Sequence, residues 1–364
     1  MLSEKLFGKP ETDAERESIR LGRRKRLLYI LIVTAAMLLL SAYSVTVSSS
    51  GITASEVYQV FINKIWPGDD PFDIEWRRQE IIWRVYYPRV LIAMCVGGTL
   101  AIGGAIVQTI LKNPLATPYT LGISSSAAFG AGIAIILGLN IANDGIYGIM
   151  VNAFIFSLIP AGVILAVSFL KNVNATTLIL IGICISYTFS AANTLMQYFG
   201  DADAVKQAMF WTVGDLDNVV IGQVKYVFAD LLFAVIASML LVNNINVMRM
   251  GDDTATSLGI NVTRVRLESI ILACLITAID VSIVGAIGFV CLLAPQISRI
   301  FVGNDMKYLI PASMVTGSLI LVLADYIAKT VIRPIMLPVG AITAVVGAPV
   351  LIYLLIRNRS RTIG

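Results

Sequence analysis

Two aspartates stand inside long apolar runs, where an acidic side chain could bind or carry a cation. Asp280 lies in the run from 267 to 287, and Asp325 lies in the run from 309 to 329. A charged aspartate at the centre of a bilayer costs roughly 2.5 to 3.5 kcal/mol, so such residues usually face a cavity or a partner. One hypothesis is a coupling-ion site of a secondary transporter. The other, which we favour, is a structural hydrogen bond, because Lys329 stands one helical turn from Asp325.

Most residues that enzymes and metal sites need are missing or unsuitably placed. The chain has no histidine, which excludes a histidine-based zinc site and haem ligation by histidine. Its four cysteines lie in apolar segments without a CxxC spacing, so we interpret them as small buried side chains. The phosphate-binding GxxxxGK(S/T) loop is absent, because the one Gly-Lys pair, Gly8-Lys9, runs into Pro10. We therefore predict no enzyme activity, no metal site and no cofactor bound by this chain.

Composition places the chain in the lipid bilayer. The mean hydropathy is +0.83 and 14% of residues are charged, whereas soluble domains carry roughly 25%. A helix needs about 20 apolar residues to cross a bilayer, so we predict an all-α polytopic protein with about ten transmembrane helices. Their approximate positions are 27–47, 89–111, 119–139, 147–170, 177–199, 224–243, 267–287, 288–302, 309–329 and 339–357. Pro295 and Arg299 interrupt one run, which predicts a short or broken helix there.

Basic residues predict the orientation of the chain. Residues 1–26 form a polar leader that ends in four basic residues, and its length argues against a cleaved signal peptide. The tail, 358–364, follows a transmembrane domain that we place at 27–357 and is also arginine-rich. The positive-inside rule puts both termini on the cytoplasmic side of the cell (plasma or inner) membrane, which requires an even number of spans. Residues 48–88 then form a long outer loop.

The segment GDDTATSLG, from Gly251 to Gly259, is a small polar run between two apolar segments. It lies in a loop, 245–266, that carries Arg249, Arg264 and Arg266, and this charge predicts a cytoplasmic position. A short helix here would be a place where a soluble partner could push on the bundle. An ordinary polar loop is the alternative. Separately, Gln108 and Gln197 fall inside spans, where they could line a polar pathway or bond across helices.

Six sequence blocks together resemble the FecCD-type permeases of ABC importers, the membrane subunits for ferric siderophores, haem and vitamin B12. The resemblance covers residues from about 27 to 357. The blocks, in order, are YYPRVL, GGAIVQTILKNPLATPYTLG, GDDTATSLG, GAIGFVCLLAPQISR, AD at Ala324-Asp325 and LPVGAITAVVGAPVLIYLL. The resemblance implies a type II ABC importer permease fold.

The same resemblance implies the partners of the chain. They are two ATPase subunits, which bind ATP and Mg²⁺, a second permease subunit of the same or a related chain, and an extracytoplasmic binding protein. No nucleic acid is expected. GDDTATSLG is implied to be the coupling helix that docks in a groove of the ATPase, through Gly251, Asp252, Asp253, Ala255, Leu258 and Gly259.

The resemblance also implies sites at both ends of the pathway. Basic residues at outer helix ends would receive acidic residues of the binding protein; the candidates are Arg84, Arg89, Lys329 and Arg333. The family's inner gate matches Asn174, Thr176 and Thr177, although Asn174 could instead cap a helix. The chain departs from the family pattern at three positions that bear on docking or substrate contacts: Tyr86, Gln296 and Met336.

The sequence therefore predicts a non-enzymatic permease subunit of an ATP-driven importer, with a ferric siderophore as cargo. Haem and a corrinoid are the alternatives within this class. An ion-coupled secondary transporter that uses Asp280, and a membrane scaffold without transport activity, are the alternatives outside it.

Overall fold

The computed structural model describes residues 13–47, 53–65, 76–142, 145–170, 174–332 and 336–362, and these residues fold into helices without a strand. Seven candidate spans are long and apolar enough to cross a membrane, and three shorter apolar helices accompany them. Together they match the predicted spans and confirm an all-α polytopic protein. The single-helix spans are α2 (Asp13–Thr46), α5 (Tyr87–Ile110), α9 (Ala175–Phe199), α11 (Ile221–Met248), α13 (Val262–Val284) and α15 (Met306–Thr330).

The remaining apolar helices are shorter or divided. α7 (Gly145–Ser157) and α8 (Ile159–Leu170) together make one span. The three short elements are α6 (Ile123–Ile136), α14 (Val290–Val302) and α16 (Val339–Thr362), of which the apolar part is Val339–Leu354. The predicted short helix near Pro295 is α14. The helical structure is interrupted before it, between Gly285 and Phe289, and Pro295 lies inside the helix.

Helix α5 lies at the centre of the bundle, and nearly every residue along it is buried. Its neighbours are α15, α11, α13, α14 and α2. Close approach depends on small residues: a Cβ atom on Gly97 would lie 2.5 Å from the backbone oxygen of Gly317 on α15. The small residue at Gly97 therefore lets the backbones of α5 and α15 meet.

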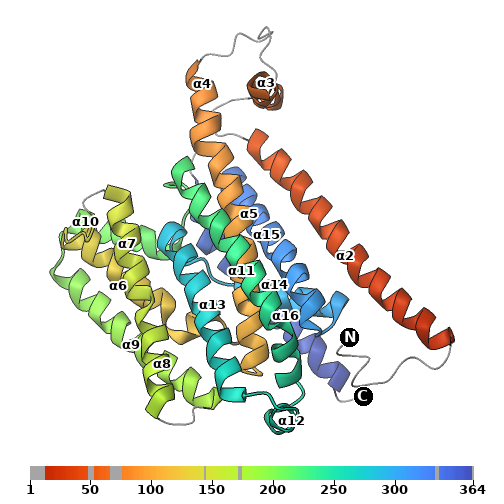
Figure 1. Cartoon of the computed structure of the whole chain (residues 1–364). Coiled ribbons are helices and arrows are strands. Elements are labelled where there is room, and N and C mark those ends of the chain that lie inside the picture. Colours follow the sequence, from red (N-terminus) through yellow and green to blue (C-terminus); the bar gives the residue numbers. More distant parts are fainter. Residues whose placement is uncertain are drawn as a thin grey trace.

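Short helices cover the two ends of the bundle (Figure 1). One end carries α3 (Ala54–Ile65), α4 (Trp76–Ile81) and α10 (Ala202–Val213), and the other carries α12 (Asp252–Ser257). α4 continues through one π-helical turn, Ile82–Tyr86, into α5, so this long helix already begins inside the predicted outer loop. We call the end with α3 and α4 the outer end and the end with α12 the inner end.

Candidate coupling site and polar networks

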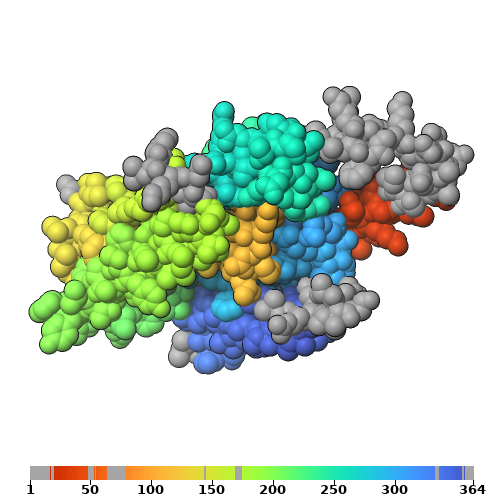
Figure 2. Space-filling model, turned by 90° about the horizontal axis from the view of Figure 1, so that it is seen from below, coloured from red at the N-terminus to blue at the C-terminus, as the bar shows by residue number. Residues whose placement is uncertain are grey.

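Helix α12 lies within the segment, Gly251 to Gly259, that we predicted to couple the protein to a soluble partner. Gly251 and Gly259 flank it with φ angles of 127° and 80°, a backbone region that favours glycine. Ala255 is fully buried and anchors the helix, whereas Leu258 is 47% exposed, and Asp253 is also exposed. The view from below shows this teal segment on the inner surface (Figure 2). A short, mostly exposed helix with a fixed entry and exit is suited to docking.

Asp252 fastens α12 to two long helices. Its Oδ1 accepts a hydrogen bond from Lys112 Nζ at 2.9 Å, and its Oδ2 accepts one from Arg266 Nη2 at 2.5 Å. Lys112 follows α5 directly, and Arg266, whose side chain is 8% exposed, belongs to α13. Partial burial of Asp252 opposes ionisation, but the hydrogen bonds from Lys112 and Arg266 outweigh it and lower the pKa of the carboxyl. We call Lys112, Asp252 and Arg266 the α12 clamp.

A second inner network, which no sequence pattern predicted, joins the loop between α14 and α15 to neighbouring helices. Asn246 Nδ2 donates to Asp305 Oδ1 at 2.9 Å, and Asn246 Oδ1 accepts from the Met306 backbone N–H at 3.0 Å. Arg249 donates to the Asn304 backbone oxygen, and Arg299 donates to the Asn304 side chain at 2.9 Å. These contacts hold the inner ends of α11, α14 and α15 together beside α12. From the sequence, only the charge of Arg249 and the position of Arg299 inside an apolar run were noted.

Gln108, a candidate pathway residue, bonds across helices in the core. Its Nε2 donates to the Cys291 and Leu292 backbone oxygens at 3.4 and 3.2 Å. Pro295 has no N–H, so it cannot donate to the Cys291 oxygen as a normal helical residue would. Gln296 in turn donates to Gln108 Oε1 at 3.0 Å and to the Pro114 backbone oxygen at 3.0 Å. Gln108 thus supplies the donor that Pro295 removes from α14.

Two candidate docking residues, Arg89 and Lys329, lie buried in an ion network near the outer end. Asp325 Oδ1 lies 2.5 Å from Arg89 Nε, and its Oδ2 lies 2.6 Å from Lys329 Nζ. Arg89 also pairs with Asp217 in the loop before α11. Asp325 therefore makes structural contacts, as we favoured over an ion site. Lys329 is one of its two partners and Arg89 is the other. Docking of a binding protein through Arg89 and Lys329 stays a prediction. In this structure both side chains already pair with Asp325.

The other docking candidates differ in position. Arg84 has a side chain that is 75% exposed and pairs with Glu80 one turn earlier. Arg333 lies outside the described residues. Close to this outer end is a cavity of about 920 Å³ whose polar lining includes Asp203, Lys206, Asp215 and Asp217. Burial raises the pKa of Asp215, although Arg89 opposes this shift.

The gate candidates lie along α9. Asn174 caps this helix, because its side-chain oxygen accepts from the Thr177 backbone N–H at 2.8 Å and from the Thr177 hydroxyl at 2.9 Å. Thr176 is exposed and Gln197 is half-buried. The alternative of a helix cap for Asn174 is therefore confirmed, while a gating role stays a prediction.

Asp280, the candidate for ion coupling, is fully buried. Its charge interacts with that of Asp230, which also lies inside a span but was not among the predicted candidates.

Comparisons with known proteins agree with this architecture. The profile of the FecCD transport family matches residues 31–357. The hemin transport system permease protein HmuU of Yersinia pestis is 33% identical over 290 residues, which cover 78% of this chain and 87% of that protein. The Fe(3+)-citrate import system permease protein YfmE of Bacillus subtilis is 32% identical over 335 residues, covering 92% and 96%. A metal-chelate type ABC transporter, solved in an inward-facing conformation, superposes with a TM-score of 0.76 at 27% identity and covers 90% of this chain and 98% of its own.

Proposed function

The chain belongs to the FecCD transport family, and from this premise we propose that it is the membrane permease subunit of an ATP-driven importer for a ferric siderophore. The family match and the membrane-spanning helices support the transporter class. Iron compounds recur in the names of its relatives, which include permeases for Fe(3+)-citrate and hemin. One of them, however, is a vitamin B12 permease and another a molybdate permease. The iron chelate is therefore the part of the proposal that most needs a test.

The observation that carries the proposal is α12, a short helix exposed at the inner end between two glycines. We propose that α12 docks in a groove of an ATPase subunit, which binds ATP and Mg²⁺. Closure of two such subunits would move α12, and the α12 clamp would pass this motion to α5 and α13. Because α5 lies at the centre of the bundle, its displacement can change which side of the pathway is open.

At the outer end we propose that Arg84 receives an acidic residue of an extracytoplasmic binding protein. Its side chain is 75% exposed, so a partner can reach it without breaking a buried network. Rim charges of this kind mainly set the association rate and orientation. Asn174, Thr176, Thr177 and Gln197 remain the candidates for the pathway between this end and α12. A second permease subunit would complete that pathway.

The proposal is tested by purifying the complex from its native membrane in mild detergent and reconstituting it in liposomes. Co-purification of an ATPase subunit and ATP-dependent uptake of a radiolabelled ferric siderophore would support it. Uptake of haem or a corrinoid in place of the siderophore would correct the cargo and keep the mechanism. Uptake that follows an ion gradient without ATP would overturn the importer proposal and would favour a role for Asp280 in ion coupling.

A further inference from the structure

Two carboxyl groups on neighbouring spans are buried close together without a partner. Asp230 on α11 is 3% exposed, and Asp280 on α13 is fully buried. No oxygen of either carboxyl has a hydrogen-bond partner within the described part of the chain. Helices α11 and α13 pack against each other, and charges on the two carboxyls would repel each other. Buried polar groups in native structures are rarely left unpaired, so this arrangement needs a physical explanation.

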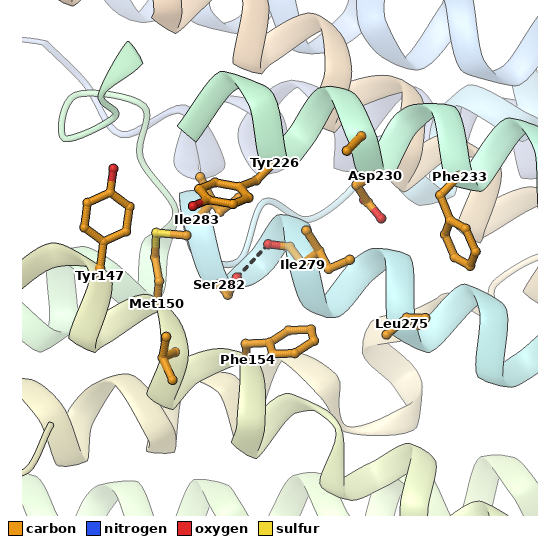
Figure 3. Close-up of a pocket in the computed structure, with 12 residues that line it drawn as sticks. Tyr147, Met150, Phe154, Tyr226, Asp230, Phe233, Leu275, Ile279, Ser282 and Ile283 are labelled. Atoms are coloured by element: carbon orange, nitrogen blue, oxygen red, sulfur yellow. Dashed lines mark hydrogen bonds between the residues drawn. The ribbon is translucent and has the colours of Figure 1, made fainter. Parts of the chain in front are cut away.

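On the side of the pair that faces α7, none of the described residues donates a hydrogen bond to it. Asp230 lies in the wall of an apolar cavity of about 650 Å³ between α7, α11 and α13. Figure 3 shows its carboxyl pointing from α11 toward α13. The Ser282 hydroxyl in this wall already donates to the Ile279 backbone oxygen at 2.7 Å. The Tyr226 hydroxyl points away from Asp230 (Figure 3).

The described surroundings of the pair also supply no positive charge. Two titratable groups that interact electrostatically with the pair are the Cys95 thiol on α5 and the Tyr119 hydroxyl in the turn before α6, and neither carries a positive charge. Tyr119 donates to the Ile287 backbone oxygen at 3.1 Å, so its hydrogen bond is directed elsewhere. Among the described residues, no lysine or arginine forms an ion pair with either aspartate. Ionised carboxylates here would therefore suffer both desolvation and mutual repulsion without compensation.

We propose that Asp230 and Asp280 form a proton-binding site within the membrane-spanning bundle, where the pair holds at least one proton at neutral pH. A proton removes the repulsion, and one carboxyl can then donate a hydrogen bond to the other. It is also a ligand small enough for oxygens that are almost sealed from solvent. The site links α11 to α13, the helices on either side of α12. Loss of the proton would place like charges between these helices and push them apart.

The direct test is infrared spectroscopy of the purified chain in lipid nanodiscs, because a protonated carboxyl has a carbonyl band that a carboxylate lacks. We expect this band at neutral pH in the wild type and its loss on raising the pH. In Asp230→Asn and in Asp280→Asn the band should change in frequency or intensity, because the carboxyl that remains has a different hydrogen-bond partner. Asp203→Asn, an exposed position on α10, is the matched control and should leave the band unchanged.

Identical protonated-carboxyl bands in the wild type and both single variants would overturn the proposal. A band that disappears on adding Na⁺ at constant pH would also overturn it, in favour of a metal-cation site. A second readout protects against misfolding: thermal stability should fall with rising pH in the wild type and fall less in whichever asparagine variant folds. These measurements need no cargo or ATPase, so their result is independent of the proposed import function.

Discussion

Several polar residues within the helical bundle bond to one another, and their partners decide what each of them can do. Gln108 donates to the carbonyl that Pro295 leaves unpaired on α14, and it accepts from Gln296. Asp325 meets Arg89 and Lys329 rather than an imported ion. The sequence predicted that Asp325 and Lys329 would be neighbours because they stand one turn apart on a helix. It could not predict Arg89 or Gln296 as partners, because those contacts join residues far apart in the chain.

Replacement of Gln108 by leucine should therefore destabilise the bundle. The change leaves the Cys291 oxygen and the Gln296 amide without their partner, at a cost of about 1–3 kcal/mol. Gln197→Leu on the half-buried side of α9 is the matched control, with an expected loss below about 1 kcal/mol. Thermal unfolding in detergent measures both. Equal stability of the two variants would contradict the role given to Gln108.

Asp252→Asn should loosen α12 while leaving the bundle folded. The substitution removes the charge that pairs with Lys112 and Arg266, and because Asp252 is partly exposed we expect a local cost of about 1–2 kcal/mol. Hydrogen exchange within α12 should then rise about tenfold, since about 1.4 kcal/mol corresponds to a factor of ten. Asp253→Asn, on the exposed side of the same turn, should change exchange little. Equal exchange rates in the two variants would show that Asp252 does not hold the helix.

At the scale of helices, the sequence predicted the membrane spans well, but it did not predict the short outer helices or the exact position of the break before α14. Apolar runs of sufficient length located every membrane helix, because the bilayer requires them. The outer helices α3, α4 and α10 were missed, since their aromatic and charged residues also suit an interfacial loop. The break before α14 was placed at Pro295, whereas Gln108 lets proline remain inside that helix.

Helix contacts decide the effect of adding one methyl group to a glycine. Intrinsic propensity alone favours alanine over glycine in any helix, by about 1 kcal/mol. On Gly97 the new Cβ would meet the Gly317 backbone 2.5 Å away, and at Gly162 on α8 nothing lies within 4 Å. We expect Gly97→Ala to destabilise the protein by about 1–3 kcal/mol through overpacking, and Gly162→Ala to be neutral or stabilising. A melting temperature that is unchanged in Gly97→Ala would refute close packing of α5 on α15.

At the scale of the whole molecule, the structure has two differently built ends joined by one central helix. The inner end presents an exposed helix whose clamp reaches α5 and α13, and the outer end presents Arg84 beside a buried ion network. The coupling route that we propose, from α12 through α5 to the outer end, rests on this layout. No periodicity or composition could have shown it, because it depends on which helices meet at the centre.

The most direct test of coupling is to measure ATP-driven uptake by the reconstituted complex carrying Ala255→Arg. Ala255 is the fully buried residue of α12, so a long charged side chain there should displace the helix from its position against the bundle. Gly259→Arg, at a φ of 80° with open space around it, should also spoil docking. We expect both variants to assemble in the membrane and to lose at least about tenfold in uptake, a loss of about 1.4 kcal/mol in coupling. Normal ATP-driven uptake in both would contradict the assignment of α12 as the coupling helix.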